Sequence, residues 1–253
     1  FINSLAYELA PEIVTSAELE SRLTPLYQKY RIPMGQLTAL TGIEERRWWP
    51  KGHLLSDGAL VAARKVIAET GIAVDDLGAV IYTGVCRDQH EPATACRIAA
   101  ELGVSTDTAI YDISNACLGV LSGILDIANR IELGQIKAGL VVSCESARHI
   151  VDVTIDDMLA QPTMQNYAQS LATLTGGSGA VAVLLTDESI SLDNIRRHQL
   201  LGASHLSRPE QNNLCQWGLK EVGPKLFREF MRTDAVSLLN EGVALAKDTW
   251  RHF

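Results

Sequence analysis

The sequence lacks the features of several protein classes. No apolar run approaches the length of a membrane span, and no signal-peptide pattern opens the chain. Basic residues are not in excess: the net charge is −8, whereas a general nucleic-acid binder needs clustered Lys and Arg to contact phosphates. We therefore expect a cytoplasmic protein with no membrane span and no nucleic-acid partner. The 253 residues, 47% of them hydrophobic, can form one large domain or two fused halves.

Paired metal-binding or disulfide-forming residues are also missing. The six histidines form no His-x-x-x-His pair, and no Cys-x-x-Cys spacing occurs among the five cysteines, which are Cys86, Cys96, Cys117, Cys144 and Cys215. An odd number of cysteines in such a composition is typical of free thiols. We therefore expect neither disulfides nor a metal site.

The apolar residues follow an alternating order of strands and helices. Strands are expected at 1–8, 79–85, 109–113, 140–144 and 180–186. Helices are expected at 16–30, 56–69, 92–102, 117–133 and 154–174. Nearly continuous apolar strands that alternate with helices predict an α/β protein whose sheet is covered on both faces.

Cys117 lies between the expected strand at 109–113 and the expected helix that follows. Leu118, Leu121 and Leu125 recur at helical spacing, so this helix should be largely buried. Backbone N–H groups and the positive dipole end at a helix start favour a thiolate, which suits a nucleophile that attacks a carbonyl. The alternative is an inert cysteine that only fills space in the core. Spacing alone leaves both interpretations open.

The residues around Cys117 resemble a known motif, and this resemblance favours the nucleophile over the inert core cysteine. Residues 112–119 read DISNACLG and closely resemble the nucleophile motif of the thiolase superfamily, in its β-ketoacyl synthase III-like branch. Residues 41–47 (TGIEERR) look like the early Thr-Gly-Ile-x-x-Arg signature of that branch. Segments 79–84, 138–145 and 176–182 match its further strands and its glycine-rich turn in the right order. The resemblance covers nearly the whole chain.

The resemblance implies a five-layer α/β/α/β/α fold made of two similar halves. Residues 1–187 look like the complete first half, which carries the nucleophile. Residues 188–253 look like the start of the second half, with a strand at 194–205 and a long helix at 225–253. Since the second half stops there and the chain starts at Phe1, we expect a piece of a longer polypeptide. The His and Asn that complete the family's Cys-His-Asn set cannot be placed in this sequence.

A second candidate site residue is Glu91, which precedes Pro92 in the segment RDQHEP at 87–92. Taken alone, Glu91 is better explained as a solvated loop residue at a helix start, since Pro fits a first helical turn. In the synthase III branch, however, this loop crosses the dimer interface. A Glu-Pro there looks like the long-chain β-ketoacyl-CoA-forming enzymes of bacterial olefin biosynthesis, in which the corresponding glutamate is the proposed base. The resemblance thus implies a homodimer whose Glu91 loop enters the neighbouring site.

The implied reaction is a Claisen condensation without decarboxylation. Cys117 would accept an acyl group from acyl-CoA, and Glu91 would remove an α-proton from a second acyl-CoA. No cofactor is needed, because the thioester supplies both the leaving group and the α-acidity. Three alternatives remain: decarboxylative condensation with malonyl carrier protein, simple acyl transfer from Cys117, and a non-catalytic partner subunit that lends only Glu91. Whether the second substrate arrives on CoA or on acyl carrier protein also stays open.

Three further residues are candidates for substrate binding. Arg46 and Trp48 stand in the run RRWW at 46–49, which could bind the CoA adenine and phosphates or form a packed surface loop. Gly177 belongs to the glycine-rich run at 176–179, whose spacing fits neither a P-loop nor a dinucleotide fingerprint. We interpret this run as room for a tight turn beside the active site.

Overall fold

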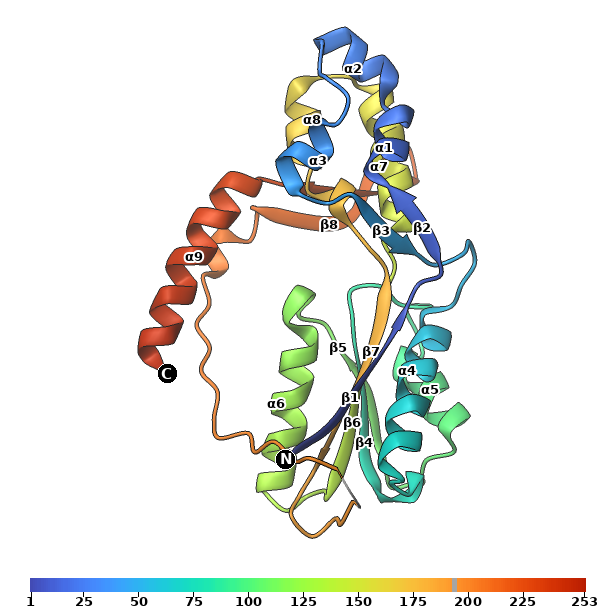
Figure 1. The fold of residues 1–253 in the computed structure, drawn as a ribbon, viewed down its shortest axis with the longest axis vertical. Coiled ribbons are helices and arrows are strands. Elements are labelled where there is room, and N and C mark those ends of the chain that lie inside the picture. The colour runs from blue at the N-terminus through green and yellow to red at the C-terminus, as the bar shows by residue number, and fades with distance from the viewer. Residues whose placement is uncertain (193–194) are drawn as a thin grey trace. The chain divides into compact units, whose positions relative to one another are not determined.

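The computed structural model of the chain describes residues 1–192 and 195–253 (Figure 1). The strands are β1 (Ile2–Leu9), β2 (Glu12–Thr15), β3 (Glu45–Trp48), β4 (Leu77–Thr83), β5 (Ala109–Ile113), β6 (Ala138–Glu145), β7 (Gly179–Thr186), β8 (Cys215–Gly223) and β9 (Leu226–Thr233). The helices are α1 (Ser16–Arg22), α2 (Thr24–Tyr30), α3 (Gln36–Thr41), α4 (Leu55–Thr70), α5 (Thr94–Leu102), α6 (Gly119–Glu132), α7 (Arg148–Ala160), α8 (Met164–Ser170) and α9 (Ala235–His252).

The chain divides into two compact units. The first comprises residues 1–11, 49–146 and 178–202. It contains a five-stranded mixed sheet in the order β1-β7-β6-β4-β5, in which β4 runs parallel to β5 and β6, and β7 runs antiparallel to β6 and β1. The expected α/β sheet is therefore confirmed.

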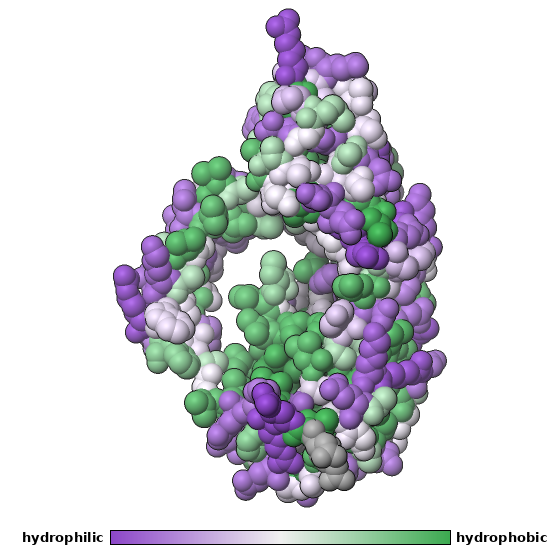
Figure 2. Space-filling model, viewed as in Figure 1, coloured by the Kyte–Doolittle hydropathy of each residue, from purple (hydrophilic) through white to green (hydrophobic). Residues whose placement is uncertain are grey.

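Helices cover both faces of this sheet, as Figure 1 shows. Successive strand residues point to opposite faces, so Val80 and Tyr82 pack in the core formed with α4 and α5. Ala79 and Ile81 pack on the other side against Ile127 of α6. Near β1 that second face is not fully covered, and exposed apolar side chains gather there and over α6 (Figure 2), including Leu5, Tyr7, Leu9, Leu118 and Leu121.

The second unit comprises residues 12–48, 147–177 and 203–253. Its apolar core is formed by α1, α2, α3, α7, α8 and Trp48 of β3. Glu20 is buried at 1% exposure, and its carboxylate accepts the N–H groups of Gly35 and Leu37, each at 2.6 Å. These bonds satisfy a carboxylate that would otherwise be costly to bury.

Two predicted helices are interrupted by prolines. The predicted helix at 16–30 is two helices that meet at Leu23, with Pro25 in the first turn of α2. The predicted helix at 154–174 is replaced by α7 and α8, which Pro162 separates. Proline lacks the N–H that a helix interior needs, so it fits only at a helix start.

The C-terminal segment differs most from the prediction. Residues 226–233, expected in a helix from 225, instead form β9, which pairs antiparallel with β8, and the helix α9 starts only at Ala235. Pro224 and Lys225 separate the two strands, and Lys225 adopts a φ of 60°. Of the predicted strand at 194–205, residue 194 lies outside the described residues, and 195–205 form only one bridge, from His198 to Ile2. The division at 187/188 into two duplicated halves stays a prediction.

Two sequence-based expectations concern the whole chain. All five cysteines are free, as expected. Among residues 1–192 and 195–253, no helix combines the length and the apolar character needed to cross a membrane.

Candidate active site

The carboxyl ends of three parallel strands define the candidate site in the first unit. Because β4 runs parallel to β5 and β6, the segments that leave these strands emerge at one edge of the sheet. The loop 84–93, which carries Glu91, follows β4; the turn 114–118, which carries Cys117, follows β5; and Glu145 ends β6. The structure thus places Glu91 and Cys117 on segments that leave neighbouring strands at the same edge.

Cys117 lies where the sequence predicted, between a strand and a helix. Its side chain is exposed within a short 3₁₀ turn directly before α6. Ala116 has a φ of 43°, a left-handed conformation that costs a residue with a Cβ about 1–2 kcal/mol. The turn is closed by two hydrogen bonds: the Leu118 N–H donates to the Asn115 carbonyl at 2.9 Å, and the Asn115 side chain donates to Ser122 Oγ at 2.8 Å. The thiol is thus presented from a tight, fixed turn.

The helix after Cys117 is held to the sheet by glycines. Gly119, Gly123 and Ile127 are its buried residues, whereas Leu118 and Leu121 are 56% and 57% exposed. The expectation of a largely buried helix is therefore wrong. A Cβ on Gly123 would lie 2.9 Å from both Thr83 Cγ2 and Val141 Cγ1, so only glycine permits this approach of helix and sheet. The leucine spacing indicated a helix correctly but not its contact face.

The loop of Glu91 is fixed at its start by β6. The Glu145 carboxylate accepts the N–H groups of Val85 at 2.7 Å and Cys86 at 3.1 Å. The buried Tyr82 hydroxyl shares its proton between the carbonyls of Cys86 and Cys144, each at 2.6 Å, and burial raises the pKa of Tyr82 far above its usual range. The loop therefore leaves the sheet in a defined direction.

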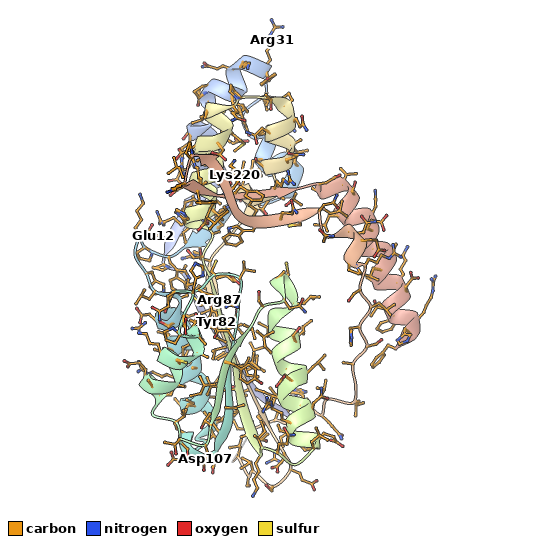
Figure 3. The ribbon with its side chains drawn as sticks, turned by 180° about the vertical axis from the view of Figure 1, so that it is seen from behind. Glu12, Arg31, Tyr82, Arg87, Asp107 and Lys220 are labelled. Atoms are coloured by element: carbon orange, nitrogen blue, oxygen red, sulfur yellow. The ribbon has the colours of Figure 1, made fainter. Side chains whose placement is uncertain are left out.

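The end of the same loop is fixed by β5. Asp112 accepts the N–H groups of Thr94 and Ala95, each at 2.9 Å, and so caps α5. Its side chain is only 4% exposed, and Arg87 Nε lies 4.0 Å from Oδ2. Figure 3 shows Arg87 just beyond Tyr82 at the end of the sheet. Between these anchors, the Glu91 side chain is exposed.

Sequence reasoning missed these carboxylates. At the start of α4, Oδ1 of Asp88 accepts the N–H groups of Leu55 at 2.6 Å and Ser56 at 3.3 Å. Asp112 was noted only as part of the nucleophile motif. Their positions could have pointed to them. Asp112 stands near the end of a strand, and Asp88 stands in the loop, so each side chain can reach the start of a helix.

The three predicted substrate-binding residues belong to the second unit. Arg46 is 6% exposed and donates to Ser16 Oγ at 2.8 Å and to the Val14 carbonyl at 3.3 Å, and burial lowers its pKa. Trp48 is 3% exposed and donates from Nε1 to the Gly176 carbonyl at 3.1 Å. Gly177 is exposed. Arg46 and Trp48 thus have defined packing roles, and substrate binding by the three residues stays a prediction.

Cys144 lies in β6, and His149 follows that strand in the first turn of α7. His149 does not line a cavity, since its side chain is 72% exposed and lies 3.8 Å from Glu229. Cys144 is fully buried, which is typical of an inert core cysteine, and burial raises its pKa to about 12.

Comparisons with known proteins match this arrangement. The family model of the thiolase N-terminal domain matches residues 53–174, a range that contains both Glu91 and Cys117. A Shewanella oneidensis protein named acyl-CoA:acyl-CoA alkyltransferase is 82% identical over all of this chain, which covers 72% of that protein. The chain belongs to the acyl-CoA:acyl-CoA alkyltransferase family. It is therefore an acyltransferase of the thiolase superfamily.

Solved structures of this family share the fold. A crystal structure of Xanthomonas campestris OleA matches with a TM-score of 0.86 at 34% identity, over 98% of this chain and 69% of that one. Another OleA structure, with lauric acid and lauroyl-CoA bound, also matches with a TM-score of 0.86. A β-ketoacyl-[acyl-carrier-protein] synthase III from Campylobacter jejuni is only 28% identical over 98% of this chain, so the decarboxylative alternative is less favoured. The thiolase-like fold is thus confirmed. The described residues contain one five-stranded sheet of this fold.

Proposed function

We propose that this acyltransferase joins two acyl-CoA molecules, with Cys117 as nucleophile and Glu91 as base. The observation that carries the proposal is the exposed thiol of Cys117, which a tight turn presents at the sheet edge from which the Glu91 loop also leaves. The membership of the acyl-CoA:acyl-CoA alkyltransferase family supports acyl-CoA as the substrate on both sides of the reaction.

In the first half-reaction the nucleophile turn supplies the attacking group. The Cys117 sulfur attacks the thioester carbonyl of one acyl-CoA, the carbon–sulfur bond to CoA breaks, and the acyl group stays on Cys117 while CoA leaves. The Cys117 N–H would stabilise the oxyanion that forms on the carbonyl. The exposed position of Cys117 on its turn gives a second molecule access to the acyl-enzyme.

The second half-reaction needs a base. Glu91 takes a proton from the α-carbon of the second acyl-CoA, and the resulting carbanion attacks the acyl carbon held on Cys117. The bond to the Cys117 sulfur breaks, and a β-ketoacyl-CoA leaves. Simple acyl transfer and decarboxylative condensation would keep Cys117 but would not require a base at Glu91.

The test separates the two half-reactions. Intact-mass measurement of the native protein after brief incubation with lauroyl-CoA should show one added acyl group, which Cys117→Ala should abolish. Glu91→Gln should be acylated normally, yet form no condensation product. A Glu91→Gln protein that condenses at the native rate would refute the assignment of Glu91.

A second experiment tests the homodimer in which the loop of one subunit enters the site of the other. Cys117→Ala and Glu91→Gln proteins, each inactive alone, are mixed under conditions that exchange subunits. Recovered condensation would support Glu91 of the partner subunit as the base, whereas no recovery after proven exchange would place both residues in one subunit. The cytoplasmic location is likewise a prediction, which cell fractionation can check.

A further inference from the structure

Three carboxylates accept backbone N–H groups in and around the loop of Glu91. Glu145, Asp88 and Asp112 come from β6, from the loop itself and from β5, and each accepts two backbone N–H groups. We propose that Glu145 and Asp112 are positioning residues that hold the Glu91 loop for proton abstraction, without acting on the nucleophile. This proposal rests on the proposed function of Glu91.

The first argument concerns the start of the loop. Each oxygen of Glu145 accepts one N–H group, Oε1 from Val85 and Oε2 from Cys86. The Cys86 thiol also donates to the Ser146 carbonyl at 3.4 Å. Bonds to an ionised carboxylate are stronger than those between neutral groups. The backbone at 85–86 is therefore fixed to the end of β6.

The second argument concerns the end of the loop. Each oxygen of Asp112 accepts one N–H group at the start of α5, Oδ2 from Thr94 and Oδ1 from Ala95. Asp112 lies beside Tyr82 in the β4–β5 register, so the same strand pair that starts the loop also receives its end. Because the carboxylate is almost fully buried, losing one of its bonds would leave a backbone donor unsatisfied.

Between these anchors the loop is open. Gln89, His90 and Glu91 are all exposed, while Asp88 is tied to the start of α4. A general base must lie within hydrogen-bonding reach of the proton it removes, and a small displacement lowers the rate strongly. Fixing the backbone on both sides of Glu91 keeps its carboxylate in a narrow range of positions without any contact to the carboxylate itself.

The test uses substitutions that keep side-chain volume. Glu145→Gln and Asp112→Asn each replace one accepting oxygen by an NH₂ group, which faces a backbone N–H and cannot accept it. We expect acylation of Cys117 by lauroyl-CoA to keep its native rate in both variants. Condensation from the acyl-enzyme, measured in a single turnover, should fall about tenfold to a hundredfold.

The matched control is Asp57→Asn. Asp57 forms a 2.7 Å ion pair with Arg97 between α4 and α5, but its side chain is 45% exposed, and none of the bonds that anchor the loop involves it. It should change neither half-reaction. Since Glu145 and Asp112 stand on different strands, one variant decides the question if the other does not fold.

The outcomes separate this proposal from the proposed function. If Glu91→Gln blocks condensation while Glu145→Gln and Asp112→Asn condense at the native rate, the positioning role is refuted and the role of Glu91 stands. If the two variants lose acylation and condensation together with a lowered melting temperature, their role is only structural and the proposal is also refuted. If Glu91→Gln condenses normally, the proposed function itself fails.

Discussion

The turn of Cys117 and the loop of Glu91 are fixed in different ways. The turn at 114–118 is held by local features: a left-handed Ala116, the backbone bond from Leu118 to Asn115 and the bond from the Asn115 side chain to Ser122. The loop at 84–93 is held by the carboxylates of Glu145 and Asp112, which come from other strands, together with Tyr82 at the end of β4. The comparison shows that a nucleophile can be placed by its own segment, whereas a base on a long loop depends on distant residues.

The largest effect is expected where the helix of Cys117 meets the sheet. Gly123→Ala places a Cβ 2.9 Å from Thr83 and Val141, so the helix must move and the protein should lose about 1–3 kcal/mol of unfolding free energy. Acylation should fall as the turn shifts. Urea denaturation and the lauroyl-CoA acylation assay measure both quantities.

Gly242→Ala is the matched control for that substitution. Gly242 lies exposed in α9, and an added Cβ there would meet nothing within 4 Å. Since alanine is a better helix former than glycine, the protein should gain about 0.5–1 kcal/mol. If both variants lose the same stability, the tight helix–sheet contact at Gly123 is not the cause.

A smaller effect is expected for Tyr82→Phe, which acts on the loop. The substitution leaves the carbonyls of Cys86 and Cys144 without their shared donor and should cost about 1–2 kcal/mol. Condensation should fall more than acylation, because the loop loosens while the turn of Cys117 keeps its own bonds. Equal losses of the two rates would contradict the separation between loop and turn.

Alkaline pH tests the thiol of Cys144, which is buried between β6 and α4. Burial raises the pKa of Cys144 from 9.0 to about 12, so in this range the folded protein keeps a proton that the unfolded chain releases. Stability is therefore fully present below pH 9 and falls above it, by up to about 1.4 kcal/mol per pH unit from this group. Denaturation at pH 8 and pH 10 should show a smaller loss for Cys144→Ala than for the native protein.

Much of the first unit could be predicted from the sequence because local signals agree there. The strand at 109–113 matches β5, and Gly71, Gly103 and Gly134 adopt the positive φ that ends a helix. The C-terminal segment was predicted less well. The apolar residues of 226–233 fit a helix and a strand almost equally, and only pairing with β8 decides for the strand.

The candidate site likewise has a part that the sequence predicts and a part that it does not. Cys117 and its turn follow from one short motif and its neighbours. Glu145 and Asp112 could not be assigned, because their partners at 85–86 and 94–95 become neighbours only when parallel strands bring three carboxyl ends together. The run of arginine and tryptophan left Arg46 open between a ligand contact and a packed loop, and its burial could not be predicted because its partners Val14 and Ser16 come from another segment.

The smallest effect on stability is expected at Ala116, where the strain of the turn can be removed. Ala116→Gly relieves a left-handed conformation worth about 1–2 kcal/mol, but the unfolded chain gains freedom worth about 0.4–1 kcal/mol. The unfolding free energy should therefore rise by about 0–1.6 kcal/mol. If strain and rigidity help to present the thiol, acylation should slow while stability does not fall, and condensation from the preformed acyl-enzyme should keep its rate. A variant that is more stable and equally fast in acylation would show that the turn tolerates its strain without using it.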